Sequence, residues 1–202
     1  MNKLEIHDLK QLIEQNYPLE YIKKILDDVL ILSLQVKNDY PDYKHWFINT
    51  QVPGLYDNTR NIIIAHIQNK IVGFVSLKKT PQEKKICTFY VEKSFRKNKI
   101  GTILVEKAIE YLEEERPLIT IPMDKLNDFI RIGNRFNWQI TEIKENLYRL
   151  NNPEVIVNGT IIEKNGIIMP PNSISKVYKI YKFKQIKQRL SIKKLFPQKL
   201  WK

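Results

Sequence analysis

One segment of the chain joins a strand pattern to a helix pattern, and it reads Phe89-Tyr90-Val91-Glu92-Lys93-Ser94-Phe95-Arg96-Lys97-Asn98-Lys99-Ile100-Gly101-Thr102. Residues 85–91, which lead into it, are rich in β-branched and aromatic side chains and predict a strand. Residues 100–115 predict an amphipathic helix, whose apolar face is formed by Ile103, Leu104, Ala108, Ile109 and Leu112. A short basic loop therefore connects a strand to a helix.

This loop has the chemistry of a phosphate site. A helix start presents unpaired backbone N–H groups and the positive end of the helix dipole. Arg96, Lys97 and Lys99 add positive charge, and Gly101 lets the backbone come close to an anion. A helix start that is only solvated would show the same residues, so the loop alone leaves both interpretations open.

The sequence before the loop predicts a three-stranded antiparallel meander. Residues 61–67 and 71–77 repeat the β-branched pattern of residues 85–91, and short polar links of hairpin length separate the three runs. Upstream of Pro53-Gly54, apolar residues recur at helical spacing instead. The first fifty residues are therefore predicted to be helical.

Three helices are expected in that region. The first is marked by Leu9, Leu12 and Ile13, the second runs from Pro18 to about Asn38, and a short third one covers residues 43–49. The third helix would place Tyr43, Trp46 and Phe47 on one face. That face is suited either to a core or to a lid over a substrate cleft.

The sequence after the long helix alternates strand and helix patterns. Residues 117–122 predict a buried strand, residues 125–135 a short helix, and residues 138–150 one or two strands. Asn158-Gly159 and Asn165-Gly166 are hairpin cues. The expected fold class is α/β (α+β), with a mixed, mostly antiparallel central sheet flanked by helices.

The element order, together with Val91-x-x-x-Phe95-Arg96-x-x-x-Ile100-Gly101-Thr102, resembles the GNAT superfamily of N-acetyltransferases. The acetyl-CoA loop of that family follows the pattern Gln/Arg-x-x-Gly-x-Gly/Ala after a strand. Arg96 matches its first position and Gly101 its last, whereas Lys99 stands where the family has glycine. The departure at Lys99 implies a differently shaped loop or an added side-chain contact to phosphate.

A second block carries the same resemblance. The family's next strand is in register with residues 117–122, and the helix after it with residues 125–135. The segment Tyr-Glu-Lys-x-Gly-Phe, which closes that helix in the family, is in register with residues up to 136–138. Trp138 takes the aromatic position and Asn137 the glycine position. The tyrosine that protonates the departing CoA thiolate in many members falls on Gly133, so the usual general acid is absent.

The resemblance implies transfer of acetyl from acetyl-CoA, as co-substrate, to an amine acceptor by direct attack on the thioester. A backbone N–H near Tyr90 or Val91 would polarise the carbonyl, and Tyr90 is the candidate catalytic acid or water-holding group, with a packing role as its alternative. No metal is implied. The residues expected at the cofactor are Tyr90, Val91, Arg96, Lys97, Asn98, Lys99, Ile100, Gly101 and Thr102.

The sequence points to no specific catalytic role for the other reactive side chains. Strand alternation sets Thr88 and Tyr90 on one face and Cys87, Phe89 and Val91 on the other, which makes Cys87 a small buried hydrophobe rather than a nucleophile. Glu92 and Asp124 could act as a base through water, although solvation is their simpler role. The histidines show no metal or triad spacing and receive no role; they are His7, His45 and His66.

Charge divides the chain. The formal net charge is +12, yet residues 164–202 hold eleven Lys and Arg and no acidic residue, so residues 1–163 are nearly neutral. We therefore expect a GNAT-like domain at 1–163, with a helical part at 1–52 and an acetyl-CoA-binding core at 55–150, followed by a basic C-terminal extension at 164–202. A helix is favoured over residues 174–195.

The extension allows three interpretations: a docked terminal element, a surface for RNA or DNA, or adsorption to an anionic membrane. The alternative functions are a toxin-like enzyme that acetylates aminoacyl-tRNA and a non-catalytic module that binds acyl-CoA or nucleic acid. One cysteine, no signal peptide and no apolar run of membrane-spanning length favour a cytoplasmic protein, which could oligomerise.

Overall fold

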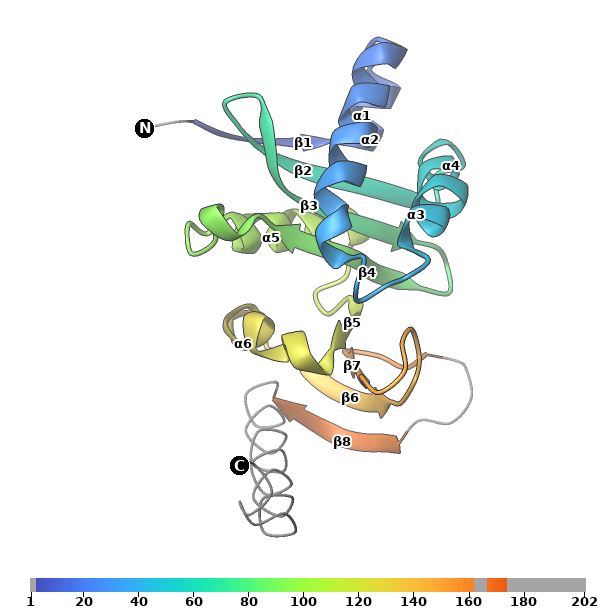
Figure 1. Cartoon of the computed structure of the whole chain (residues 1–202), viewed down its shortest axis with the longest axis vertical. Coiled ribbons are helices and arrows are strands. Elements are labelled where there is room, and N and C mark those ends of the chain that lie inside the picture. Colours follow the sequence, from blue (N-terminus) through green and yellow to red (C-terminus); the bar gives the residue numbers. More distant parts are fainter. Residues whose placement is uncertain (1–2, 162–166, 174–202) are drawn as a thin grey trace, which may run out of the picture.

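The computed structural model describes residues 3–161 and 167–173, and an eight-stranded sheet in the order β1-β2-β3-β4-β5-β7-β6-β8 runs through them (Figure 1). Every neighbouring pair is antiparallel except β4 and β5. The sheet is therefore mixed and mostly antiparallel, as expected. The strands are β1 Leu4–Asp8, β2 Arg60–Ile67, β3 Lys70–Lys79, β4 Lys84–Val91, β5 Leu118–Pro122, β6 Gln139–Lys144, β7 Glu154–Val157 and β8 Ile167–Ser173.

The meander of β2, β3 and β4 matches the predicted one. The link between β2 and β3 is tight because Gln68 and Asn69 both have positive φ, at 51° and 61°, which suits the twist of a hairpin. The pairing of β3 with β4 changes register between Ser76 and Leu77, so Cys87 is an extra residue on β4. This bulge corrects the simple alternation expected for Cys87.

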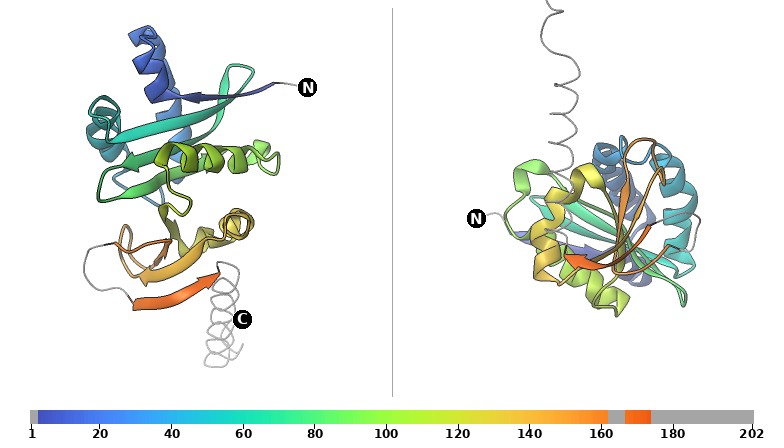
Figure 2. Two further views of the ribbon diagram at one scale, coloured as in Figure 1. Left: turned by 180° about the vertical axis from the view of Figure 1, so that it is seen from behind. Right: turned by 90° about the horizontal axis from the view of Figure 1, so that it is seen from below.

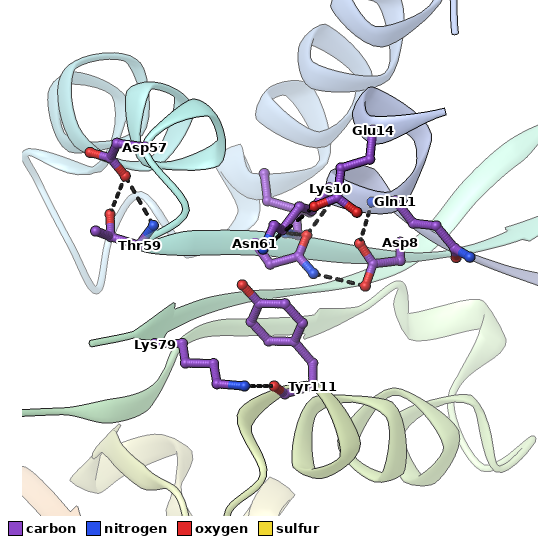
Figure 3. A network of polar contacts seen from close by, with 10 residues as sticks. Asp8, Lys10, Gln11, Glu14, Asp57, Thr59, Asn61, Lys79 and Tyr111 are labelled. Atoms are coloured by element: carbon purple, nitrogen blue, oxygen red, sulfur yellow. Dashed lines mark hydrogen bonds and ion pairs between the residues drawn. The ribbon is translucent and has the colours of Figure 1, made fainter. Parts of the chain in front are cut away.

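Strand β1 is the main correction at the N-terminus, where only helices were predicted. Leu4–Asp8 pairs with β2, and Leu4 and Ile6 pack on the core below. This segment is too short for its side-chain pattern to distinguish a strand from a helix. Its pairing with β2 therefore determines that it is a strand. Asp8 then caps α1 by accepting from Gln11 N at 3.0 Å, and it also accepts from Asn61 Nδ2 at 2.8 Å (Figure 3).

The helices form a layer on each face of the sheet (Figures 1 and 2). One layer contains α1 Leu9–Glu14, α2 Leu19–Ser33, α3 Tyr43–Trp46 and α4 Val52–Tyr56, and the other contains α5 Ile100–Leu112 and α6 Leu126–Arg135. Alternate residues of β2 feed the two cores, since Ile62 and Ile64 pack under the first layer and Ile63 and Ala65 under the second.

Two helix boundaries differ from expectation. A π-helical segment, Phe47–Gln51, joins α3 to α4, and α4 continues through Pro53-Gly54 to Tyr56. Proline fits there because it lies in the first turn of α4, where its missing N–H costs no hydrogen bond. Helix α5 ends at Leu112, because Glu113 adopts a left-handed conformation with φ of 50°.

The C-terminal half also differs in detail. Residues 138–150 contribute one strand, β6, followed by turns. The Asn158-Gly159 hairpin prediction is wrong within the described residues, because Asn158 closes β7 by bonding to Gln139 and Pro117 instead of turning back. Strand β8 pairs with β6 although it lies beyond the expected boundary at 163. The Asn165-Gly166 cue and the expected helix over 174–195 lie outside the described residues.

Candidate active site

Strands β4 and β5 separate soon after they pair. Their parallel pairing consists of Lys85 with Leu118 and Ile86 with Ile119, after which β5 continues to pair only with β7. The edge of β4 from Cys87 to Val91 is therefore not covered by β5. We call this divergence the split; it divides the sheet into an N-terminal and a C-terminal half (Figure 1).

The backbone of Val91 faces the split. Its carbonyl oxygen accepts a hydrogen bond from Arg96 Nε at 3.0 Å, whereas the next residue, Glu92, donates its N–H to Val72 on β3. Because backbone groups alternate in direction along a strand, the N–H of Val91 points to the same side as its carbonyl. A polar group at the split can therefore reach this N–H.

The loop between β4 and α5 keeps a left-handed backbone at the position where a lysine replaces glycine. Lys99, which directly precedes α5, has φ of 63°, and Lys97 has φ of 68°. The loop thus has the backbone conformation that glycine adopts readily, and the lysines carry a conformational cost of about 1 kcal/mol each. The side chains of Lys97, Asn98 and Lys99 are exposed.

Gly101 is closely packed in the first turn of α5. A Cβ atom there would lie 3.1 Å from Phe89 Cζ and 3.3 Å from Ile132 Cδ1. Phe89 belongs to β4 and Ile132 to α6, so the glycine lets the helix start approach both elements. The sequence had suggested that Gly101 gives an anion access to the backbone; the contacts add a packing reason.

Arg96 is held by several protein groups. Besides the bond to Val91, its Nη1 donates to Asp128 at 3.1 Å, and its guanidinium carbon lies 5.7 Å from the ring centroid of Tyr90. Tyr90 itself is 9% exposed, and burial raises the pKa of its hydroxyl above the usual 10. Tyr90 therefore stays protonated at neutral pH and can act as a donor.

A cavity of about 320 Å3 opens on the other side of the split, under the N-terminal helices. Both halves of the sheet contribute to it, because Thr88 comes from β4 and Thr120 from β5. We call it the acceptor cavity. Its lining consists of Tyr40, Pro41, Asp42, Tyr43, Trp46, Arg60, Lys78, Glu83, Lys85, Cys87, Thr88, Thr120 and Tyr148.

The aromatic residues of the third predicted helix divide between two environments. Tyr43 and Trp46 line the acceptor cavity, whereas Phe47 is 2% exposed in the core beneath the N-terminal helices. Tyr43 stacks on Phe47 with ring centroids 6.0 Å apart. The core therefore fixes the cavity wall, and two of the three aromatic residues for which a core or a lid role was open border the cavity.

Glu154 is a candidate functional residue that the sequence did not reveal. It is 2% exposed, and among the described residues none donates a hydrogen bond to its Oε2. Burial first, and then the negative charge of Asp39, raises its pKa to about 8. Strand register places Glu154 on the same face as Thr120, which lines the acceptor cavity.

Tyr40 lines this cavity and lies near enough to Glu154 for the two groups to interact electrostatically. Burial raises the pKa of Tyr40 well above 10, and the nearby Glu154 carboxyl raises it further, while a hydrogen bond with Thr120 acts in the opposite direction. The only sequence signal for Glu154 was an acidic residue preceding the β-branched run at 155–157. That signal does not distinguish a buried carboxyl from a solvated strand start.

The two carboxylates named from the sequence have other partners. Glu92 forms an ion pair with Lys70 at 2.8 Å. Asp124 forms one with Arg149 at 3.0 Å and accepts from Asn152. Both are engaged in structural contacts on the surface of the domain.

Cys87 lines the acceptor cavity because of the bulge on β4. Burial raises the pKa of its thiol, so the neutral form persists. In the second family-like block, Gly133 is buried in α6 and offers no proton donor, while Asn137 has φ of 52°, as its place at a glycine position predicts.

A larger hollow of about 810 Å3 lies away from the split, between β1, α1 and the end of α5 (Figure 3). Two of its lysines already bind protein groups. Lys79 forms an ion pair with Glu113 at 3.1 Å and donates a hydrogen bond to the Tyr111 carbonyl, and Lys84 donates to the Glu113 carbonyl. These bonds satisfy carbonyls at the C-terminal end of α5. We therefore assign this hollow a structural role.

Within the described part of the chain, no group of three or more His, Cys, Asp or Glu side chains could hold a metal ion. No helix in that part is both long and apolar enough to cross a membrane.

The split sheet with a helix start at its edge defines an acyltransferase-type fold, and a family comparison gives the same class. The model of the acetyltransferase (GNAT) family matches residues 19–124. The chain therefore belongs to the GNAT acetyltransferase family. A search of curated proteins returned no match.

Solved structures support the fold. A protein described as of the GNAT family from Desulfovibrio desulfuricans is 9% identical, with a TM-score of 0.51, covering 77% of this chain and 97% of its own. An acetyltransferase of the GNAT family from Staphylococcus aureus Mu50 is 17% identical, with a TM-score of 0.50 and coverages of 76% and 98%.

Proposed function

We propose that this protein transfers the acetyl group of acetyl-CoA to the nitrogen of an amine acceptor by direct attack on the thioester. The observation that carries the proposal is the position of the acceptor cavity. It is lined by Thr88 and Thr120 from the two sides of the split, and Val91 exposes its backbone to the same split. A thioester held along β4 could therefore meet an amine held in the cavity.

Residues 90–102 would hold acetyl-CoA. The uncovered edge of β4 can bond to the amide groups of the pantetheine arm, and the Val91 N–H can polarise the thioester carbonyl. The first N–H groups of α5, at Ile100, Gly101 and Thr102, suit a diphosphate, with the exposed Lys97, Asn98 and Lys99 beside it. The backbone conformation and the exposed cations of this loop fit that ligand.

Proton transfer completes the reaction. As the new C–N bond forms and the C–S bond breaks, the attacking nitrogen must lose a proton and the CoA thiolate must gain one. Glu154, with its raised pKa, is suited to accept the first through Tyr40 or water. Tyr90 is the candidate donor of the second proton, because Gly133 occupies the position of the family's usual tyrosine and has no proton to donate.

The direct test is calorimetric titration of the full chain with acetyl-CoA, followed by an assay of CoA thiol release in the presence of amines. We expect saturable binding and amine-dependent thiol release. No binding at millimolar acetyl-CoA would contradict the proposal.

The basic C-terminal extension favours a second candidate acceptor, an amine that is part of an RNA, as in aminoacyl-tRNA. Residues 174–202 carry ten of the eleven basic residues of the extension, and a chain ending at Ser173 would keep β8. A gel shift with tRNA compares this chain with the full one. We expect salt-sensitive binding that requires residues 174–202, and equal affinity of both chains would contradict this role.

A further inference from the structure

The acceptor cavity contains a row of three cations that runs across three neighbouring strands. Arg60 on β2 is directly opposite Lys78 on β3, and Lys78 is directly opposite Lys85 on β4. All three side chains line the cavity. Like charges directly opposite one another in a sheet destabilise it, so this cationic row requires a compensating anion or a functional reason.

The protein compensates only part of this charge. Lys78 forms an ion pair with Glu83 at 2.6 Å. Neither Arg60 nor Lys85 forms an ion pair with a carboxylate of the described residues, and the remaining acidic residue of the lining, Asp42, is exposed. Two cations of the row therefore have no direct carboxylate partner; Lys85 interacts with Glu154 only at longer range, where its charge lowers the pKa of that carboxyl.

Arg60 is held in position in advance. A Cβ atom on Gly54 would lie 2.5 Å from Arg60 Cδ, so α4 packs directly on the arginine stem. The guanidinium lies 5.4 Å from the ring centroid of Trp46, and its Nη1 is 3.4 Å from Gln51 Oε1. A guanidinium that is fixed in this way loses little entropy on binding an oxyanion.

We propose that the acceptor is an amine that carries an oxyanion, either a carboxylate or a phosphate, and that Arg60 and Lys85 bind this group. The inference rests on the proposed acetyl transfer and specifies its acceptor. The amine would lie toward Thr88 and Thr120, at the split, and the oxyanion at the cationic row. A polycationic amine is disfavoured, because the row would repel it.

Two pairs of probes test this and distinguish the two anions. β-Alanine is compared with β-alaninamide, and phosphoethanolamine with ethanolamine. Binding to the full chain, with and without CoA, is measured from shifts of its amide NMR signals, and kcat/KM is measured with acetyl-CoA. We expect at least one charged probe to exceed its uncharged partner by about 10- to 100-fold, as for one or two charge-assisted hydrogen bonds.

Charge-removing variants localise the effect. Lys85→Gln and Arg60→Gln should reduce the preference for the charged probe by about tenfold each. The matched control is Lys84→Gln, which removes the same charge one residue away, where Lys84 binds the Glu113 carbonyl outside the cavity. This control should retain the preference, and comparing each probe across variants cancels differences in amine basicity.

The outcomes separate the two proposals. Equal binding of charged and uncharged probes, or an equal effect of Lys84→Gln and Lys85→Gln, overturns the oxyanion site. If the charged probe binds selectively and depends on Lys85, but the chain neither binds acetyl-CoA nor releases CoA, the oxyanion site stands and the proposed acetyl transfer fails.

Discussion

The loop of residues 89–102 and the acceptor cavity border the same split, but the chain builds them differently. The loop is one contiguous segment, and its proposed contacts to acetyl-CoA come mainly from backbone groups. Lys97 and Lys99 have a left-handed conformation, and Gly101 packs against Phe89. The cavity gathers side chains from Tyr40 to Tyr148, and the buried Glu154 lies beside it. Changes in the loop should therefore act on acetyl-CoA, and changes around the cavity on the acceptor and its proton.

The largest effect is expected from Gly101→Glu. Its side chain would meet Phe89 and Ile132 and would place a negative charge at the start of α5, where the diphosphate is proposed to bind. Overpacking of this kind costs about 1–3 kcal/mol in the free energy of unfolding. Acetyl-CoA binding, measured by calorimetry, should fall at least 100-fold, which matches a loss of about 2.7 kcal/mol.

Gly101→Ala is the control for packing alone. It introduces the close contact to Phe89 without the charge, so it should lower stability slightly and keep most of the affinity. If alanine abolishes binding as fully as glutamate does, packing of α5 rather than phosphate binding explains the effect of both variants.

Glu154→Gln should have the next largest effect, and it concerns the cavity. Loss of a proton acceptor is expected to lower kcat by about 100-fold or more. The wild-type rate should rise with pH up to about 8, because the pKa of Glu154 is raised to about 8 and only its ionised form accepts a proton. This rising limb should disappear in the variant, and an unchanged pH profile would exclude Glu154 as the base.

Stability gives an independent readout of the same carboxyl. The folded-state pKa of about 8 lies above the unfolded value of 4.5, so the folded state keeps a proton that the unfolded state has lost. The free energy of unfolding should therefore fall between pH 4.5 and 8, by up to about 1.4 kcal/mol per pH unit. Denaturant titrations of Glu154→Gln should show a weaker decline over this range.

The two regions also differ in how well the sequence predicted them. The loop could be predicted because strand, cap and helix follow one another along the chain, and the left-handed backbone at Lys99 lies where the family has glycine. Cys87 was misplaced, because a bulge depends on pairing with β3. Strand β1 and Glu154 were missed, because burial and pairing with distant strands decide their roles.

Arg149→Ala tests what holds the cavity together. Arg149 follows β6 and pairs with Asp39 at 3.3 Å and Asp124 at 3.0 Å, so it connects the C-terminal half of the sheet to the N-terminal helices. Without it, Asp39, which is 6% exposed, loses its ion-pair partner and keeps only the longer-range interaction with Lys125. We expect a loss of about 1–2 kcal/mol in denaturant titrations and weaker acceptor binding.

The matched control is Arg135→Ala, which breaks an ion pair with Glu106 whose side chains are both well exposed. Its effect should stay within about 0.5 kcal/mol. Equal losses in the two variants would mean that Arg149 does not link the two halves of the sheet.

Lys99→Gly should have the smallest effect and the opposite sign. At φ of 63° a lysine is strained and a glycine is not, which favours the variant's folded state. Glycine also has more conformational entropy in the unfolded chain, which opposes part of this gain. The net result should be a gain of about 0.5 kcal/mol in the free energy of unfolding, with acetyl-CoA affinity reduced only by the lost charge.

The control is Lys93→Gly, in the helical turn Lys93–Phe95. It should destabilise the protein, because Lys93 has no left-handed strain that glycine could relieve. If both variants destabilise it equally, the left-handed lysine stores no strain and the loop backbone differs from the one described.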